Sequence, residues 1–413
     1  MENEKTSARL DSAGNFRWIL LVFGTICLLF AGIIYGWSIL KGAFADEFGW
    51  SAGDLATNYT ITISLFCIGC IAGGFMMKKF SPKIPVILGG ILVFTGFFLT
   101  SRLSGGSVVS LFITYGVLAG LGIGIAYNVI LAVLGAWFPD KKGFASGCLM
   151  MGFGASTLIL GNLASSLMAS PSFGWRMVFL LLAVCTGVLL ILMGLLIRLP
   201  GPNDHLPKPN AAASKKEEFE TTDMTTSQML ARPSFWKFFA AMILLGAGGS
   251  SVISFAKDFS ISVGTTAAAA GLFVGVLSIF NGFGRIIAGS VFDRFGRKTC
   301  MIYVGIVTLA ANILCLGAAF TGSVILCLLG FCAIGLSYGG NTNVVSVFIT
   351  AFYGNKYYAQ NLSLGLLTIM PASILAKFST TLLTVTGSYV VPFAVLTGYA
   401  AAAMALNLSN KRP

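Results

Sequence analysis

Long apolar stretches recur along almost the whole chain and are separated by short polar segments. About 20 apolar residues in a helix cross roughly 30 Å of hydrocarbon, so each stretch predicts a transmembrane helix. The first stretch is too long for a signal peptide and lacks a small-residue cleavage site, so we expect it to be retained. The pattern predicts an all-α membrane protein with twelve spans, at residues 16–40, 55–77, 85–102, 107–133, 144–169, 175–197, 235–257, 267–291, 299–320, 324–349, 361–384 and 388–408.

One long hydrophilic segment, residues 198–234, divides the predicted helices into two groups of six. Its mixture of Pro, Lys and Glu indicates a flexible linker that does not fold alone. The predicted organisation is a cytoplasmic tail, an N-terminal six-helix bundle, a cytoplasmic linker, a C-terminal six-helix bundle and a second cytoplasmic tail, at residues 1–15, 16–197, 198–234, 235–408 and 409–413.

The basic residues are distributed unequally between the two sides of the membrane. If the amino terminus is cytoplasmic, 20 of the 26 Lys and Arg residues lie on that side, and only Lys41, Arg102, Arg176 and Lys257 lie on the other. This imbalance places both termini inside by the positive-inside rule. We therefore expect a multi-pass protein of the cell (inner) membrane, and the net charge of +12 indicates orientation in a lipid bilayer and not a nucleic-acid partner.

The sequence gives little sign of metal or acid–base chemistry. The single histidine, His205, lies in the linker, and Cys67 and Cys70 share a helix with no second pair or histidine nearby. Packing explains this pair better than a metal site does. We predict no cofactor and no enzymatic activity.

The two halves repeat each other. "GFMMKKFSPK" from Gly74 aligns with "GSVFDRFGRK" from Gly289, and "WFPDKKGFASG" from Trp137 aligns with "FYGNKYYAQNL" from Phe352, both at a shift of 215 residues. Two loops with one shift indicate a duplicated six-helix unit. Parallel repeats of this kind place a substrate site between the halves near the bilayer midplane.

"GSVFDRFGRK" resembles the G-x-x-x-D-R-x-G-R-K loop of the major facilitator superfamily, and the resemblance covers essentially the whole chain. It implies that Asp293 and the neighbouring bases form a cytoplasmic latch that changes partners during transport; the latch residues are Gly289, Asp293, Arg294, Gly296, Arg297 and Lys298. Positive-inside charge alone is the alternative. In the first-half copy Lys78 stands where the family has Asp, so we do not expect the usual salt bridge there.

"NGFGR", "WFPDKKGFASG" and "YGWS" also resemble the oxalate/formate antiporters and the bacterial monocarboxylate transporters. "NGFGR" contains Arg285, which lies eight residues before Asp293 and thus about 12 Å into the span. No Asp or Glu lies inside a span to pair with it. A guanidinium stays charged and binds a carboxylate with two parallel hydrogen bonds, and the resemblance likewise implies a substrate carboxylate. Alternatively, backbone carbonyls hold Arg285, or it reaches toward the cytoplasm.

Four polar side chains are candidate partners of the same substrate. Asn281 lies one turn from Arg285 on the same helical face; the animal monocarboxylate transporters have a proton-coupling Asp there, so this route is absent. Tyr127 and Tyr338 lie at midplane depth, and Tyr35 lies nearer the outer interface. Helix–helix hydrogen bonding for Asn281, core packing for Tyr127 and Tyr338, and a place in the interfacial belt for Tyr35 are the alternatives.

The position of a second cation bears on substrate size. The resemblance implies a Lys in the middle of the 361–384 helix for dicarboxylates, but Pro371 stands there and Lys377 is displaced six residues. We therefore predict a monomeric secondary transporter of small monocarboxylates such as lactate, pyruvate or formate, with symport or antiport by alternating access and protons as the expected coupling ion. An oxalate/formate-type exchanger, a carrier of another substrate and a transporter-like sensor remain alternatives.

Overall fold

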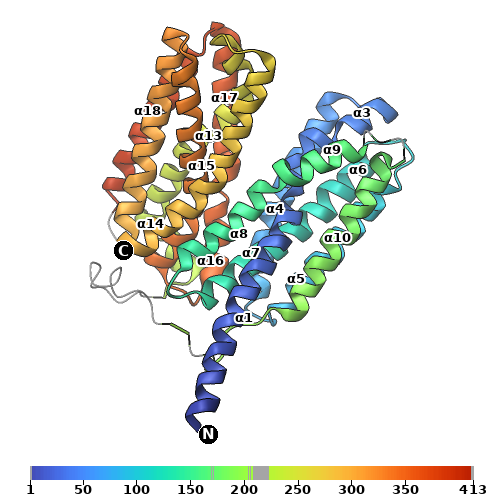
Figure 1. The fold of residues 1–413 in the computed structure, drawn as a ribbon, viewed down its shortest axis with the longest axis vertical. Helices are drawn as coiled ribbons and strands as arrows, with labels where there is room; N and C mark the ends of the chain where they lie inside the picture. Colours follow the sequence, from blue (N-terminus) through green and yellow to red (C-terminus); the bar gives the residue numbers. More distant parts are fainter. Residues whose placement is uncertain are drawn as a thin grey trace. The chain divides into compact units, whose positions relative to one another are not determined.

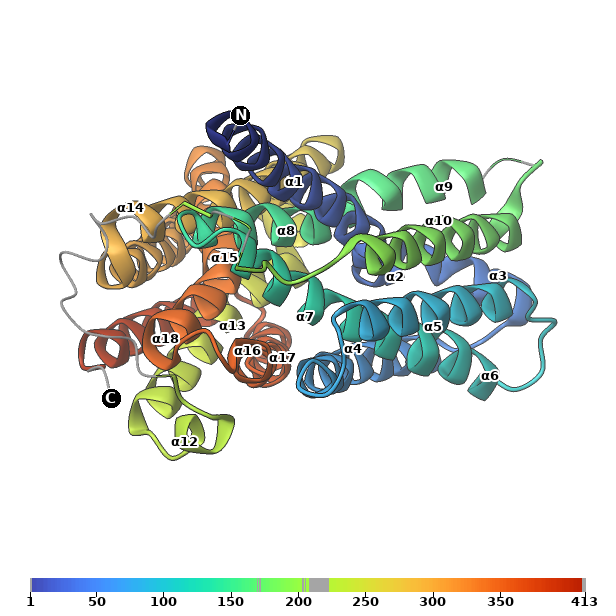
Figure 2. The ribbon, with the colours of Figure 1, turned by 90° about the horizontal axis from the view of Figure 1, so that it is seen from below.

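The computed structural model describes the backbone of residues 2–168, 170, 172–202, 204, 206–207 and 223–410, which form helices, turns and loops without a β-strand. Packing divides the chain into two units. The first contains Met1–Pro139 and Gly152–Lys208, and the second contains Asp140–Met151 and Pro209–Pro413. The second unit is thus discontinuous in sequence, since twelve residues before the linker belong to it. Figures 1 and 2 together label the α-helices of both units.

Helix α8 (Lys142–Ser156) contributes residues to both units, and α14 (Ala267–Thr321) belongs to the second. The remaining elements of the first unit are α1 (Glu2–Ala31), the 3₁₀ helix η1 (Gly32–Gly36), α2 (Trp37–Leu40), α3 (Gly42–Phe48), α4 (Ala52–Met76), α5 (Lys83–Ser101), α6 (Val109–Leu111), the π-helical η2 (Phe112–Ala119), α7 (Gly120–Trp137), the π-helical η3 (Thr157–Gly161), α9 (Asn162–Met168) and α10 (Gly174–Leu196). Several of these run on without a loop, as α6, η2 and α7 do, so that Val109–Trp137 forms one span.

The second unit continues with α12 (Thr226–Leu230), α13 (Pro233–Ser262), α14, α15 (Val324–Tyr353), α16 (Tyr358–Leu366), α17 (Ile369–Thr386) and α18 (Val390–Leu408). Figure 2 shows α12 beside α13. Aromatic side chains from three helices, including Phe259, Phe331 and Phe393, meet in the core of this unit. Their burial removes apolar surface from contact with solvent or lipid and packs α13, α15 and α18 together.

Eleven helices among the described residues are long and apolar enough to cross a membrane. Their outer faces carry exposed large apolar side chains, among them Leu272, Ile325 and Val385. Such faces are unfavourable in water and favourable in lipid. The chain is therefore a multi-pass membrane protein with an all-helical fold.

The predicted spans 267–291 and 299–320 lie in one stretch, α14, which is interrupted at Gly296. Gly296 has φ +79° and ψ 179°, a conformation open to glycine because it has no Cβ. The chain changes direction at this residue without forming a separate loop. The helix predicted at 361–384 is likewise divided, since α16 ends at Leu366 and α17 begins at Ile369. Pro371 lies in the first turn of α17, where its missing N–H is tolerated.

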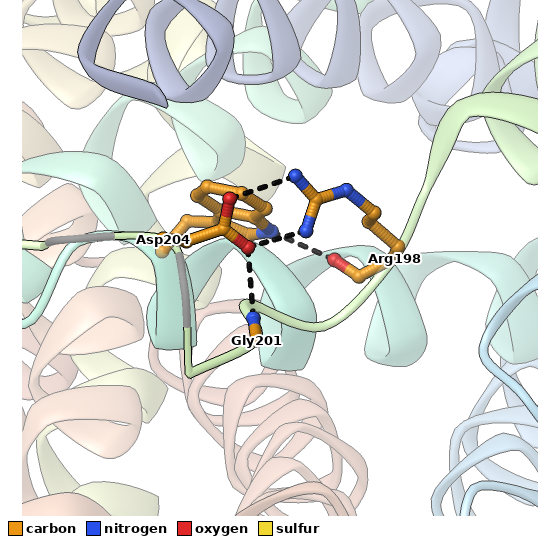
Figure 3. A network of polar contacts seen from close by, with 4 residues as sticks. Arg198, Gly201 and Asp204 are labelled. Carbon is orange, nitrogen blue, oxygen red and sulfur yellow. Dashed lines mark hydrogen bonds and ion pairs between the residues drawn. The ribbon is translucent and has the colours of Figure 1, made fainter. Parts of the chain in front are cut away.

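The predicted linker is ordered at both ends. At its start, Arg198 forms an ion pair with Asp204, and the Asp204 carboxylate also accepts a hydrogen bond from the Gly201 backbone N–H at 2.8 Å, as Figure 3 shows. Hydrogen bonding to Arg198 lowers the pKa of Asp204 to about 2. The Trp137 indole N–H donates to the Arg198 carbonyl at 2.7 Å, which fixes this turn to the end of α7.

At the other end of the linker, Asp223 accepts hydrogen bonds from the backbone N–H groups of Asn355 and Lys356 at 2.9 and 3.1 Å. Thr225 and Gln228 then form a capping box that starts α12. These bonds fix the segment to the turn between α15 and α16. Local polar partners thus hold both ends of the predicted linker, whose flexibility stays a prediction. Residues 208–222 and His205 lie outside the described residues.

Candidate functional site

Arg285 is buried in the second unit. It lies on α14, where only 6% of its surface is exposed. One guanidinium nitrogen, Nη1, donates a hydrogen bond to the carbonyl of Met150 on α8. The buried Nε has no hydrogen-bond partner, and no carboxylate forms an ion pair with Arg285 within the part of the chain that the structure describes. On the Nε–Nη2 edge of the guanidinium, the buried Nε therefore lacks an acceptor.

This arrangement is unusual for a buried charge. A charged group inside a protein or membrane is normally paired or fully hydrogen-bonded, because desolvation is costly. One neutral carbonyl satisfies one of the five guanidinium N–H groups. The free edge matches the two oxygens of a carboxylate, which would supply both charge and acceptors.

Asn281 lies one helical turn before Arg285 on α14. Its Oδ1 is buried and has no hydrogen-bond partner. It is close to α15, since a Cβ added to Gly339 would lie only 3.0 Å from this oxygen. Gly335, one turn earlier on α15, similarly faces the Leu277 carbonyl and the Asn281 backbone. Glycines on α15 thus allow the Asn281 segment of α14 to approach closely, and they leave the amide oxygen available as an acceptor.

Tyr338 lies on α15 and is partly buried. The Ser250 hydroxyl on α13 donates to its hydroxyl oxygen at 3.3 Å. The ring lies against Gly249, where an added Cβ would come within 2.2 Å of ring carbon Cδ2. The glycine leaves room for the ring, and Ser250 orients the hydroxyl, whose proton remains available for a further acceptor.

Tyr127 and Tyr35 belong to the first unit, and the structure brings them to one aromatic side chain there. Tyr127 is 5% exposed, and its ring centroid lies 4.7 Å from that of Phe153. Tyr35 packs edge-on against the same Phe153 at 5.2 Å. Phe66 completes the cluster, with centroids 5.3 Å from Tyr127 and 5.7 Å from Phe153. These contacts orient both tyrosine rings.

The structure thus groups the predicted site residues by unit. Arg285, Asn281 and Tyr338 lie on α14 and α15 of the second unit, and Tyr127 and Tyr35 lie in the first. The side chain of Lys377, which would decide whether a second cation is present, lies outside the described residues.

In the latch segment, Asp293 contacts the first turn of α8. Its two carboxylate oxygens accept hydrogen bonds from the backbone N–H groups of Gly143 and Phe144 at 2.9 and 2.8 Å. These N–H groups have no partner within their own helix, and a carboxylate also interacts favourably with the helix dipole. Asp293 therefore caps α8. Gly289, one turn earlier, touches Gly143, since a Cβ added to Gly289 would lie 2.0 Å from the Gly143 carbonyl oxygen.

Two bases of the latch segment, Arg294 and Arg297, lie close to aromatic rings. Arg294 and Lys298 are exposed, and the Arg294 guanidinium lies 5.9 Å from the Phe295 ring centroid. The Arg297 guanidinium lies 4.4 Å from the Phe352 ring centroid, within range of a cation–π interaction. In this structure the backbone of α8 provides the hydrogen-bond donors to Asp293.

Sequence reasoning missed several polar residues that surround the start of α8. The Lys142 ammonium donates to Asn355 Oδ1 at 2.6 Å and lies 3.8 Å from the Tyr358 ring centroid. Asn343 on α15 is fully buried and bonds to α8 and α14. The stretch "GGNTNVVSV" contains two asparagines inside an apolar helix, and intramembrane polar residues of this kind indicate specific interactions.

Comparison with known proteins gives concordant results. The sequence model of the Major Facilitator Superfamily matches residues 21–376. The oxalate:formate antiporter of Oxalobacter formigenes is 28% identical over 363 residues, which cover 87% of this chain and 83% of the antiporter. Monocarboxylate transporter 12 of Xenopus laevis is 28% identical over 313 residues, or 71% of this chain and 66% of the transporter.

A solved structure shows the same fold. The proton:xylose symporter XylE, bound to 6-bromo-6-deoxy-D-glucose, superposes with a TM-score of 0.72 at 15% identity, covering 95% of each chain.

Proposed function

Because the chain belongs to the Major Facilitator Superfamily, as the match over residues 21–376 shows, we propose that it is a secondary active transporter of small monocarboxylate anions. Arg285 binds the substrate carboxylate, and Asn281 and Tyr338 orient it. Tyr127 and Tyr35 stay predicted contributors from the first unit. Lactate, pyruvate and formate are the expected substrates.

The unpaired edge of the Arg285 guanidinium carries this proposal. Nη1 is occupied by the Met150 carbonyl, and the buried Nε has no partner. A carboxylate on the Nε–Nη2 edge forms two charge-assisted hydrogen bonds without displacing Met150. Sugars and other neutral substrates leave the buried charge uncompensated, so they fit this edge less well.

The neighbouring groups support a small anion. Asn281 Oδ1 is an acceptor without a donor, and it suits a hydroxyl of the substrate or an N–H of the guanidinium itself. Tyr338 offers a hydroxyl proton as a further donor. A carboxylate bound between Arg285 and such donors is stabilised by both charge and hydrogen bonds, which is the requirement for a site in a medium of low polarity.

Energy coupling has two candidates. Proton symport with the monocarboxylate requires that the proton travel on substrate or water, since no predicted span has an internal carboxylate. Anion exchange is the second candidate, and the similarity to an oxalate:formate antiporter over 87% of the chain favours it.

The proposed topology has twelve crossings, with both termini and the linker in the cytoplasm of the cell that makes the protein. The bundles 16–197 and 235–408 then alternate between two access states. Asp293 and the bases Arg294, Arg297 and Lys298 form the latch, which holds α8 in one state and releases it in the other. The cap at Gly143 and Phe144 supports this role for Asp293.

Uptake into proteoliposomes tests the function. Labelled lactate, formate and oxalate are offered with and without an inward proton gradient and with each anion preloaded. We expect saturable monocarboxylate uptake by the wild type and none by Arg285→Gln, which keeps the polarity but removes the charge. Arg102→Gln is the matched control, because the same exchange is made at a guanidinium that lies 5.3 Å from the Phe98 ring centroid in the first unit. Equal uptake by wild type and Arg285→Gln would reject the proposal.

A further inference from the structure

Asn343 uses its whole carboxamide group in hydrogen bonds to two other helices. It lies on α15 and is 0% exposed. Its Nδ2 donates to the Arg285 carbonyl at 2.8 Å and to the Gly143 carbonyl at 3.0 Å. Its Oδ1 accepts from the Ser146 hydroxyl at 2.5 Å. One side chain therefore joins the anchor segment of α14 to the first turns of α8.

Three other asparagines of the second unit do not share this pattern. Asn281, Asn312 and Asn341 each have a buried Oδ1 without a hydrogen-bond partner. The bond from Asn341 Nδ2 to the Met242 carbonyl is long, at 3.4 Å. A buried amide group whose donors and acceptor are all hydrogen-bonded holds the surrounding helices in one arrangement. Asn343 is thus distinguished by its bonding and not by its residue type.

Close helix packing makes the bonds of Asn343 possible. A Cβ added to Gly147 on α8 would lie 2.7 Å from the Arg285 carbonyl oxygen, and one added to Gly289 would lie 2.6 Å from Asn343 Nδ2. Glycine at these positions lets the backbones of α8 and α14 approach within reach of one amide group. The Met150 carbonyl, which binds the Arg285 guanidinium, lies on the same helix one turn after Ser146.

We propose that Asn343 is a positioning residue for the Arg285 anchor: by bonding the Arg285 backbone and the start of α8 together, it sets the distance between the guanidinium and the Met150 carbonyl. The inference rests on the proposed function, because it assigns Asn343 a role in carboxylate binding. Asn343 acts on the backbone of Arg285 and leaves the guanidinium edge free for substrate. Without Asn343, the guanidinium and its neutral acceptor lose their fixed geometry.

The test compares Asn343→Leu with Asn341→Leu. Both remove a buried amide from α15, but only the first removes bonds to Arg285 and Gly143. Hydrogen–deuterium exchange of residues 143–150 is measured first without any carboxylate. The KM and kcat for formate and lactate uptake are then measured in proteoliposomes. We expect faster exchange and a KM raised about tenfold in Asn343→Leu, since small misplacements of a binding group have large effects.

Ser146→Ala provides a milder variant in case Asn343→Leu does not fold. It removes the bond to Asn343 Oδ1 and leaves the two Nδ2 bonds, so we expect a smaller increase in both exchange and KM. Unchanged exchange in Asn343→Leu would show that Asn343 does not hold α8 and α14 together, and would overturn the proposal. Faster exchange with an unchanged KM, or the same KM change in Asn341→Leu, would show a merely structural role and overturn the positioning role.

The two failures are distinguishable. If the wild type takes up no monocarboxylate, the proposed function fails, and the role of Asn343 in carboxylate binding fails with it. The exchange measurement still shows whether Asn343 holds α8 and α14 together. If the wild type transports and the Asn343 variants bind as well as it does, only the inference about Asn343 is overturned.

Discussion

Replacing Arg285 by lysine separates the charge of the anchor from its shape. Lysine keeps the positive charge but has a single nitrogen, so it cannot present the paired Nε–H and Nη2–H donors of a guanidinium. In the structure Nη1 is occupied by the Met150 carbonyl and the Nε edge is unpaired. Lysine at this position must satisfy both Met150 and the substrate from one ammonium group.

The expected loss follows from this difference. At least one charge-assisted hydrogen bond to the carboxylate is lost, at a cost of about 1.5–3 kcal/mol. That free energy corresponds to a rise of about 10- to 150-fold in the dissociation constant. The long-range attraction between unit charges is retained, so Arg285→Gln should bind still more weakly than Arg285→Lys.

Isothermal titration of the purified protein with formate and lactate measures the effect. Arg102→Lys is the matched control, since the same exchange is made at a residue over the Phe98 ring, and we expect its dissociation constants to equal those of the wild type. Should Arg285→Lys bind both anions as tightly as the wild type while Arg285→Gln does not, the site uses a point charge and the argument from the guanidinium edge is wrong.

Three other variants test individual contacts. Asp293→Asn loses the charge that caps α8 and should lower the free energy of unfolding by about 1 kcal/mol. Its melting temperature should therefore be lower than that of the control variant Asp258→Asn. Equal melting temperatures of the two variants would contradict the cap. Gly289→Ala places a Cβ 2.0 Å from the Gly143 carbonyl oxygen, whereas the Cβ of Gly271→Ala meets nothing within 4 Å. Only Gly289→Ala should therefore reduce the yield of monodisperse protein in size-exclusion chromatography. Equal yields of the two variants would refute the close packing of Gly289 against Gly143. Asp204→Asn should speed trypsin cleavage after Arg198, because the ion pair that orders this turn is lost. Since the pKa of Asp204 is lowered to about 2, below its ordinary value near 3.9, its stabilisation is complete above about pH 4 and is lost as the pH falls through 2; wild-type protection should therefore not change between pH 6 and 8, and a decline across that range would argue against the pair.

Much of the fold is readable from the sequence, because lipid requires long apolar helices. The family predicted from "GSVFDRFGRK" is confirmed by the superfamily match. The helices predicted at 267–291 and 299–320 lie on either side of a break at Gly296 within α14, but the conformation of this break was not predicted. Turn conformation depends on backbone angles, and hydropathy does not encode these.

The candidate site was readable only in part. Arg285 is conspicuous, since a permanent charge in an apolar stretch requires a partner. Its acceptor, the Met150 backbone carbonyl, has no signature in the sequence, because every residue carries one. Asn343 was missed for a related reason: its partners are two backbone carbonyls and the Ser146 hydroxyl, which become neighbours only when three helices pack. Likewise, the ordered linker ends depend on partners such as Trp137 and Asn355, far away in the chain.

The discontinuity of the second unit has a consequence for dissecting the protein genetically. Twelve of its residues, Asp140–Met151, are encoded before the linker. If the gene were split within the linker, the carboxyl-terminal polypeptide would lack the Gly143 N–H that donates to Asp293 and the Gly143 carbonyl that accepts from Asn343. Expressed by itself, that polypeptide would have to fold without these hydrogen-bond partners, so recovery of a stable product should require co-synthesis of the amino-terminal piece.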